Sequence, residues 1–297
     1  MMEFTPMNET GFLYIATGEK FVREALRSVA SLRAHMPSAR TCCFTDAPER
    51  VREHFDLVER IEKPYRNFFE KIPPLSRTPF ERTIFVDTDT VFAAPMLDVF
   101  DVLERFDLAA APDPFWCEIP RVPAAFQQLN TGLIAYRNNA KVRQFFTEWF
   151  DDYEKGFTAA GAPRHMHDQA VFQRRLFYSD LRIYVLAPEY NFRLTCPQLA
   201  RIWAPVRMLH GRHTDLADLG RRVNAQHDVR IVWPNAQHLV RSNMFLVSRA
   251  GDAILRAATA LPKFAVKAAL DAQRWIRRPA KPVRVPAPAA APAAAGG

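Results

Sequence analysis

Short apolar segments typical of buried β-strands alternate with helical segments through most of the chain. Residues 11–16 and 41–45 have the composition of buried strands, and the segment between them carries apolar side chains on one helical face, with Pro37 just past its end. The other predicted strands are 57–61, 83–86, 108–111, 133–136, 183–186 and 206–210, and the other helices are 142–153 and 169–177. This alternation predicts an α/β protein, a three-layer sandwich around a mostly parallel central sheet.

Composition narrows the class of protein. The chain has 297 residues, of which 48% are apolar and 24% charged, so it can bury a core and wholesale disorder is excluded. No run reaches the ~18 apolar residues of a membrane-spanning helix, and the start MMEFTPMNET lacks the basic segment of a secretory signal. The four cysteines, two of them adjacent at Cys42 and Cys43, have neither zinc-site nor disulfide-framework spacing. A cytoplasmic protein is predicted.

The positive charge lies in the C-terminal part of the chain. Residues 241–297 hold 10 of the 40 Lys/Arg and 2 of the 32 Asp/Glu, so residues 1–240 balance at 30 of each sign. Because residues 1–240 carry no net charge, we predict no nucleic-acid partner. We predict a main α/β domain over residues 1–240, a basic helical extension over 241–278 and a Pro/Ala-rich disordered tail over 279–297.

The C-terminal extension has an amphipathic pattern. On a helical wheel Lys263, Lys267, Arg274 and Arg278 share one side, and apolar residues that include Phe and Trp share the other. This pattern is typical of a helix over 261–278 that lies on an anionic membrane surface, peripheral on its inner face. The alternative is a helix packed on its own domain with a solvated basic face.

The strongest local signal for chemistry is the apolar strand 83–86, which is followed directly by Asp87-Thr88-Asp89. In open α/β sheets the ligand crevice lies beyond the carboxyl ends of the strands. Two carboxylates one residue apart at such an end can share a divalent cation, which would stabilise a diphosphate leaving group. The simpler alternative is a solvated turn.

The same residues also resemble the nucleophile motif of haloacid-dehalogenase-like phosphatases. In that interpretation Asp87 would attack a phosphate and Asp89 would act as acid and base. That family needs a later acidic pair at a strand end. The adjacent pair Asp151-Asp152 falls in a helical pattern instead, which counts against the phosphatase interpretation.

Further motifs follow one another in a fixed order along residues 11–215. They are Leu13–Thr17 at the end of the first strand, Lys71 sixteen residues before Asp87, Leu129-Asn130-Thr131-Gly132 before a strand, Asp168-Gln169 opening a helix, and His210-Gly211-Arg212 after a strand. In this order and spacing the chain resembles the retaining, family-8-like glycosyltransferases of the GT-A fold, the group of glycogenin-like and lipopolysaccharide-type sugar transferases. The resemblance implies a GT-A-type nucleotide-diphospho-sugar transferase fold.

The resemblance also implies a metal site and a donor site. Asp87, Asp89 and His210 would bind Mn²⁺ or Mg²⁺ bridging the donor diphosphate, and an imidazole with two carboxylates suits Mn²⁺. Lys71, Thr88 and Arg212 would contact the donor, while Thr17, Gly18 and Lys20 would line the nucleotide pocket. Asn130 would hydrogen-bond the transferred sugar, and Asp168 and Gln169 would lie at its reacting face.

The sequence departs from the family pattern near the last motif. The family often has a Lys where Arg212 stands, and His213 could replace His210 as the metal ligand. The turn after the first strand also lacks the acid that often reads a uracil base. Taken alone, each motif has a simpler interpretation: a surface lysine for Lys71, a turn for Asn130–Gly132, a helix N-cap for Asp168 and a core histidine for His210.

Together these observations predict a metal-dependent, retaining glycosyltransferase that uses a nucleotide-sugar donor, with a UDP-sugar as the first expectation. The acceptor would be a sugar, a lipid-linked molecule or a protein. The alternatives are a phosphatase with Asp87 as nucleophile, and a catalytically inactive module of the same fold at the membrane surface.

Overall fold

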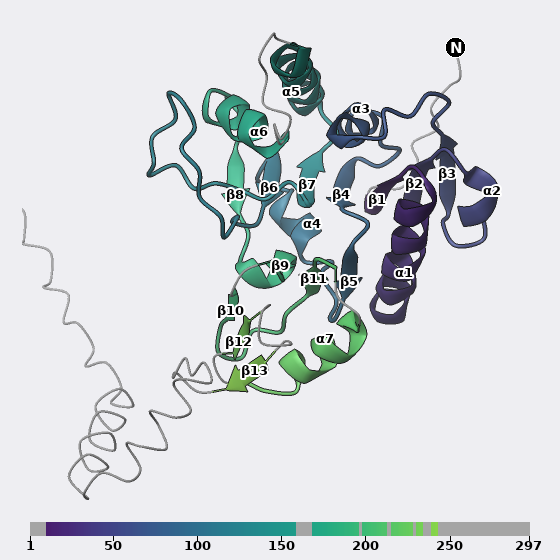
Figure 1. Ribbon diagram of the computed structural model, residues 1–297, viewed down its shortest axis with the longest axis vertical. Coiled ribbons are helices and arrows are strands. Elements are labelled where there is room, and N and C mark those ends of the chain that lie inside the picture. The colour runs from purple at the N-terminus through teal and green to yellow at the C-terminus, as the bar shows by residue number, and fades with distance from the viewer. Residues whose placement is uncertain are drawn as a thin grey trace, which may run out of the picture. The chain divides into compact units, whose positions relative to one another are not determined.

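The computed structural model describes residues 10–158, 168–195, 198–212, 215–227, 230–233 and 239–242. Its largest element is a seven-stranded sheet in the order β3-β2-β1-β4-β7-β6-β8 (Figure 1). The strands are β1 (Thr10–Ala16), β2 (Thr41–Thr45), β3 (Leu57–Arg60), β4 (Arg82–Val86), β6 (Leu108–Ala110), β7 (Leu133–Arg137) and β8 (Ile183–Val185). Every neighbouring pair is parallel except the two pairs that include β7. The predicted α/β class with a mostly parallel sheet is therefore confirmed.

Helices cover both faces of this sheet. Phe12 and Tyr14 of β1 lie in one hydrophobic core with residues of α1 (Glu19–His35), α2 (Pro48–Val51) and α4 (Val99–Val102). Leu13 and Ile15 lie in a second core with residues of α3 (Ile72–Leu75), α5 (Ala140–Thr158) and α6 (Asp168–Phe177). Successive strand residues point to opposite faces, so the two cores lie on the two sides of the sheet and the predicted three layers are present.

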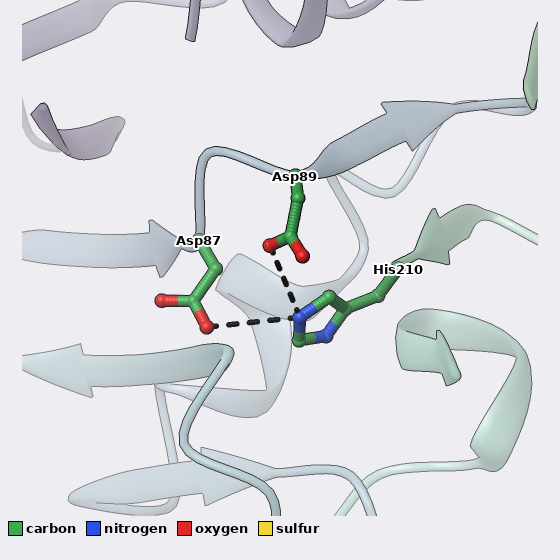
Figure 2. A group of neighbouring side chains, drawn as sticks. All are labelled: Asp87, Asp89 and His210. Atoms are coloured by element: carbon green, nitrogen blue, oxygen red, sulfur yellow. Dashed lines mark ion pairs between the residues drawn. The ribbon is translucent and has the colours of Figure 1, made fainter. Parts of the chain in front are cut away.

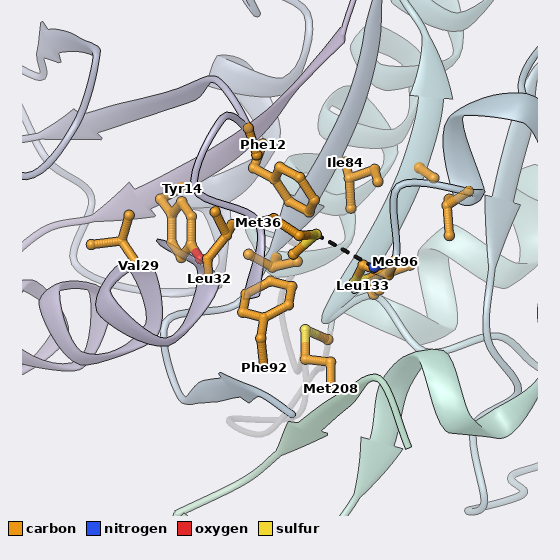
Figure 3. Packing of buried hydrophobic residues seen from close by; sticks show 14 of the residues in the cluster. Phe12, Tyr14, Val29, Leu32, Met36, Ile84, Phe92, Met96, Leu133 and Met208 are labelled. Atoms are coloured by element: carbon orange, nitrogen blue, oxygen red, sulfur yellow. Dashed lines mark hydrogen bonds between the residues drawn. The ribbon is translucent and has the colours of Figure 1, made fainter. Parts of the chain in front are cut away.

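The core on the α1 side is closely packed (Figure 3). The ring of Phe12 meets the rings of Phe92 and Phe100 edge to face, with centroids 5.7 Å apart in each pair. Fully burying a side chain of this size contributes about 1.5–3 kcal/mol. This packing joins β1, the strand beside β4, to β5 and α4, the two elements that follow the turn carrying Asp87.

Two small sheets accompany the large one. The first contains β5 (Thr90–Phe92), β11 (Met208–His210) and β9 (Phe192–Arg193), and the second contains β10 (Gln198–Ala200), β12 (Arg230–Trp233) and β13 (Leu239–Ser242). Strand β11 pairs antiparallel with β5, which places His210 opposite Thr90. Helix α7 (Leu216–Asn224) packs against both strands, below the large sheet in Figure 1. This register brings a histidine from late in the chain beside the turn that follows β4.

The predicted elements of the main domain are present with shifted ends. The longest shift is in α5, predicted over 142–153 and observed over Ala140–Thr158. The segment 65–77 holds two short helical turns, η1 (Phe68–Lys71) and α3, because proline is tolerated in the first turn of a helix and Pro73-Pro74 lie in the first turn of α3. Among the described residues, the elements that were not predicted are α2, β5, α4, η2 (Pro188–Asn191), β9, β10, α7, β12 and β13.

The described residues end at Ser242. The predicted extension over 241–278, its membrane-surface helix and the tail over 279–297 therefore fall almost wholly outside them, and those domain limits stay predictions. Within the described part of the chain, no helix is both long and apolar enough to cross a membrane.

Candidate metal centre

Asp87 and Asp89 lie on the three-residue turn between β4 and β5, at the carboxyl end of a central strand. The backbone N–H of Asp87 donates to the carbonyl of Gly132 at 2.9 Å, and the hydroxyl of Thr90 donates to the carbonyl of Asp87 at 2.8 Å. Thr88 between them points to α1, where its hydroxyl donates to Glu24 Oε2 at 3.0 Å. The turn is thus held from three sides, and its two carboxylates point the same way (Figure 2).

His210 faces both carboxylates from the end of β11 (Figure 2). Its Nε2 lies 3.6 Å from Asp87 Oδ2 and 3.5 Å from Asp89 Oδ1. The residue is 4% exposed. One ligand atom from each of the three residues falls within 4.8 Å of the others, which makes this a group that could hold a metal ion. One imidazole nitrogen with two carboxylate oxygens is a donor set suited to Mn²⁺ or another divalent cation.

The two carboxylates differ in their electrostatic setting. Burial raises the pKa of Asp87 above its usual range, and the charge of Lys71 opposes this only in part. Burial would raise the pKa of Asp89 too, but contacts with His210 and the charge of Arg212 outweigh it, so the Asp89 pKa is lowered. Arg212 Nη1 lies 3.4 Å from Asp89 Oδ2. A divalent cation placed here would favour the charged form of both groups.

Amide substitutions at these two positions are expected to change the stability of the metal-free protein in opposite directions. Asp87→Asn removes a charge that burial disfavours, so the melting temperature should rise near neutral pH. Asp89→Asn removes a charge whose pKa is lowered and that lies 3.4 Å from Arg212 Nη1, so the melting temperature should fall. A change of about 1 kcal/mol corresponds to about 2–4 °C for a domain of this size. Thermal unfolding in the presence of a chelator measures both.

The pH dependence follows from the direction of each pKa shift. A carboxyl whose pKa is raised on folding adds stability at low pH and loses that contribution as the pH rises through its folded pKa, whereas a lowered pKa adds stability that is lost as the pH falls. As the pH falls toward about 4, the increase in melting temperature caused by Asp87→Asn should disappear first. The loss from Asp89→Asn should persist to lower pH. Equal falls in melting temperature for both variants would contradict this assignment.

A buried ion pair lies beside the candidate centre. Lys71 Nζ is 2.7 Å from Asp168 Oδ2, and the hydroxyl of Thr131 accepts from Lys71 and donates to the same carboxylate oxygen, each at 3.0 Å. Burial alone would lower the pKa of Lys71, but the charges of Asp168 and Asp87 outweigh it and the pKa is raised. Asp168 is the first residue of α6, and its carbonyl accepts from the indole N–H of Trp149 at 3.1 Å. Lys71 is therefore not a solvated surface lysine.

Asn130, Gln169 and Asp113 form a hydrogen-bonded cluster. Asn130 Nδ2 donates to Asp113 Oδ2 at 3.0 Å and to Gln169 Oε1 at 2.9 Å, and Gln169 Nε2 donates to the same Asp113 oxygen. Asn130 Oδ1 accepts from the backbone of Gly132 and from Asn191. Asn130 is 2% exposed, and its amide is fully used within the protein. Its predicted hydrogen bond to a sugar stays a prediction, and it would require one of these bonds to open.

Two of the predicted nucleotide-binding residues, Thr17 and Gly18, follow the end of β1, and the third, Lys20, lies in α1. The hydroxyl of Thr17 donates to Glu70 Oε2 at 3.1 Å, and the N–H of Gly18 donates to Asp46 Oδ1 at 3.0 Å. Gly18 precedes α1 with φ +83°, a backbone conformation that favours glycine. The two-residue turn after β1 has no acidic residue, but Glu70 and Asp46 approach it from other segments. Whether Thr17 and Gly18 contact a nucleotide stays a prediction.

Arg212 and Lys20 approach the same aromatic ring. The Arg212 guanidinium carbon lies 6.0 Å and Lys20 Nζ 5.7 Å from the centroid of Phe21. Arg212 is also held by Glu24, with Nε 2.8 Å from Oε1 and Nη2 3.1 Å from Oε2. One glutamate thus fixes both Arg212 and the Thr88 hydroxyl, so Glu24 couples α1 to the candidate metal centre.

Several site residues were not predicted from the sequence. Asp113, Asn191 and Glu24 contact predicted residues directly, yet each stands alone in its segment, with no motif spacing to mark it. The alternative ligand His213 lies outside the described residues. The acidic pair considered for a phosphatase lies within α5, where Asp152 pairs with Arg175, so a strand-end pair is not formed by these residues.

Comparison with known proteins gives a distant relationship. No protein-family profile matches the chain. Glycogenin-1 from Oryctolagus cuniculus and from Homo sapiens are each 27% identical to it over 154 residues, which cover 44% of this chain and 42% and 40% of those proteins. The match therefore spans about two fifths of the curated relatives. The glycosyltransferase GlyE of Streptococcus pneumoniae TIGR4 matches in structure with 17% identity and a TM-score of 0.48, over 63% of this chain and 47% of that one.

A mostly parallel sheet with an Asp-x-Asp turn at a central strand end and a histidine beside it is the arrangement expected for the GT-A class of fold. Within that class the chain is a distant, family-8-like homologue of glycogenin-1. The resemblance inferred from the motifs is confirmed at this level.

Proposed function

We propose that this chain is a divalent-metal-dependent glycosyltransferase that moves a sugar from a nucleoside-diphosphate donor to an acceptor. The observation that carries the proposal is the grouping of Asp87, Asp89 and His210 at the carboxyl end of β4 in a distant homologue of glycogenin-1. Mn²⁺ is the expected cation and a UDP-sugar the first donor to test. The resemblance implies retention of anomeric configuration.

The proposed roles follow from position and charge. Asp87, Asp89 and Nε2 of His210 would hold the cation, which supplies positive charge to a leaving diphosphate. Arg212, 3.4 Å from Asp89, would add a second positive group at the same place. Lys71 and Asp168 would lie toward the sugar, with Gln169 held beside them by Asn130. Catalysis would then come from leaving-group stabilisation and from holding donor and acceptor together.

A thermal-shift screen tests the proposal directly. UDP-, GDP- and dTDP-sugars are each added with and without Mn²⁺ to the wild type, to Asp89→Ala and to Asp101→Ala, an exposed carboxylate of α4 that serves as the control. A ligand near 100 times its Kd adds roughly 2.7 kcal/mol, a shift of several degrees. We expect one nucleotide class to shift the wild type and Asp101→Ala only with Mn²⁺, and Asp89→Ala not at all.

Two other outcomes would contradict the proposal. A shift with beryllofluoride, a phosphate mimic, and none with nucleotide sugars would favour the phosphatase. No shift with any ligand would favour an inactive module of the same fold.

A further inference from the structure

The orientation of one buried amide beside the candidate metal centre is fixed by the backbone. The N–H of Gly132 lies 3.0 Å from Asn130 Oδ1 and can only donate a hydrogen bond. The oxygen and nitrogen of an asparagine amide are otherwise assigned from their partners. The opposite end of Asn130 faces a carboxylate oxygen of Asp113, which can only accept while ionised. The contacts at both ends of the Asn130 amide therefore fix the same orientation, in which its oxygen faces Gly132 and Asn191.

Asn191 is fixed in turn by Asn130. It is the last residue of η2 (Pro188–Asn191), it is 1% exposed, and its Nδ2 lies 2.8 Å from Asn130 Oδ1. An acceptor requires a donor opposite, so the NH₂ group of Asn191 faces Asn130. Its oxygen must then face the other way, where it lies 2.7 Å from Nδ1 of His210.

This hydrogen bond determines the tautomer of His210. Opposite an amide oxygen, Nδ1 must carry the proton, and a neutral imidazole carries only one. The lone pair is therefore on Nε2, the nitrogen that lies 3.5 Å and 3.6 Å from the two carboxylates. A ligating histidine binds metal through such a lone pair, with its other nitrogen donating to a fixed acceptor.

We propose that Asn191 is a positioning residue of the metal centre, which holds His210 in the Nδ1–H tautomer so that Nε2 is ready to bind the cation. The inference rests on the metal centre of the proposed function. Without an acceptor at Nδ1, two carboxylates beside Nε2 would attract the proton to that nitrogen, and the proton would then occupy the direction of the metal bond. The chain from Gly132 through Asn130 and Asn191 opposes that transfer.

The first test measures the tautomer in the metal-free full chain. Imidazole ¹⁵N chemical shifts distinguish the two tautomers of a neutral imidazole, and the His210 signals are those missing from His210→Gln. We expect the wild type to be Nδ1–H, and Asn191→Leu to shift toward Nε2–H. An Nε2–H ring in the wild type would overturn the proposal even if no Asn191 variant folds.

The second test measures binding of Mn²⁺ alone by calorimetry. Loss of a group that orients a metal ligand weakens metal affinity by about 10–100-fold, so we expect that loss for Asn191→Leu. Asn191→Ser keeps a hydroxyl that can both accept and donate, and it should lose less. The control is Asn224→Leu, which removes an amide bonded to Val206 and Ala93 and should lower stability but not Mn²⁺ affinity.

Wild-type Mn²⁺ affinity in Asn191→Leu, or an equal loss in Asn224→Leu, would overturn the proposal. Neither measurement uses a nucleotide sugar, so this proposal and the proposed function fail separately.

Discussion

Alanine in place of Gly132 is expected to weaken Mn²⁺ binding at least about 100-fold. Loss of a group that only orients a metal ligand costs up to about 100-fold, and this substitution would displace the ligand His210 itself. A Cβ at this position would lie 2.0 Å from Cε1 and 2.7 Å from Nδ1 of His210, and 2.9 Å from Asn130 Oδ1. The imidazole is buried, so it can relieve the clash only by leaving its position opposite Asp87 and Asp89. Overpacking of this kind costs about 1–3 kcal/mol of stability. Calorimetry with Mn²⁺ and thermal unfolding measure the two effects.

Gly11→Ala provides a matched control for the Gly132 substitution. A Cβ at Gly11, in β1, would lie 2.4 Å from the ring of Phe80, so crowding is comparable in kind. The neighbour there is an apolar ring and not a candidate ligand. We expect similar destabilisation with unchanged Mn²⁺ affinity. If both variants bound Mn²⁺ equally well, His210 would not be a ligand in the arrangement described above.

The fold was predictable mainly where a strand or helix is long enough to show its period, although the nine-residue helix α7 was not predicted. Strand β1 and helix α1 each present a continuous apolar pattern, and the acids after β4 follow a buried strand directly. Strands β5 and β9 have three and two residues, which is too short for any periodicity, and of this small sheet only β11 lies within a predicted strand, 206–210. Their pairing, which places His210 opposite Thr90, depends on tertiary packing.

The candidate site shows the same division. Asp87 and Asp89 were predicted from local sequence, whereas Lys71 and His210 were predicted only through the spacing of a family resemblance. Asn191 could be found by neither route. Its function depends on hydrogen bonds to Asn130 and His210, which are 61 and 19 positions away. No spacing in the sequence marks such a three-residue chain, because each member comes from a different segment of the fold.

Separate removal of the two charges in the Lys71–Asp168 pair is expected to destabilise the protein by about 3–5 kcal/mol in each case, because the remaining charge stays buried without its partner. The side chains of Lys71 and Asp168 are 13% and 5% exposed, and their atoms are 2.7 Å apart. Urea unfolding of Lys71→Met, Asp168→Asn and the double variant gives the coupling energy. The double variant leaves neither charge of this pair without its partner, so its loss should be smaller than the sum by at least about 1 kcal/mol. Lys141→Met, at an exposed lysine of α5, should be near neutral.

The same variants separate the structural role of this pair from its proposed part in catalysis. If Lys71 and Asp168 only stabilise the fold, the double variant should recover donor-dependent activity along with stability. If they also contact the sugar, as proposed, stability should recover in the double variant while transfer stays lost. A Lys71→Met protein as stable as the wild type would contradict the buried pair itself. The Thr131 hydroxyl, 3.0 Å from each partner, remains to bond either residue alone, so the measured coupling reports the charge pair and not the loss of every polar contact.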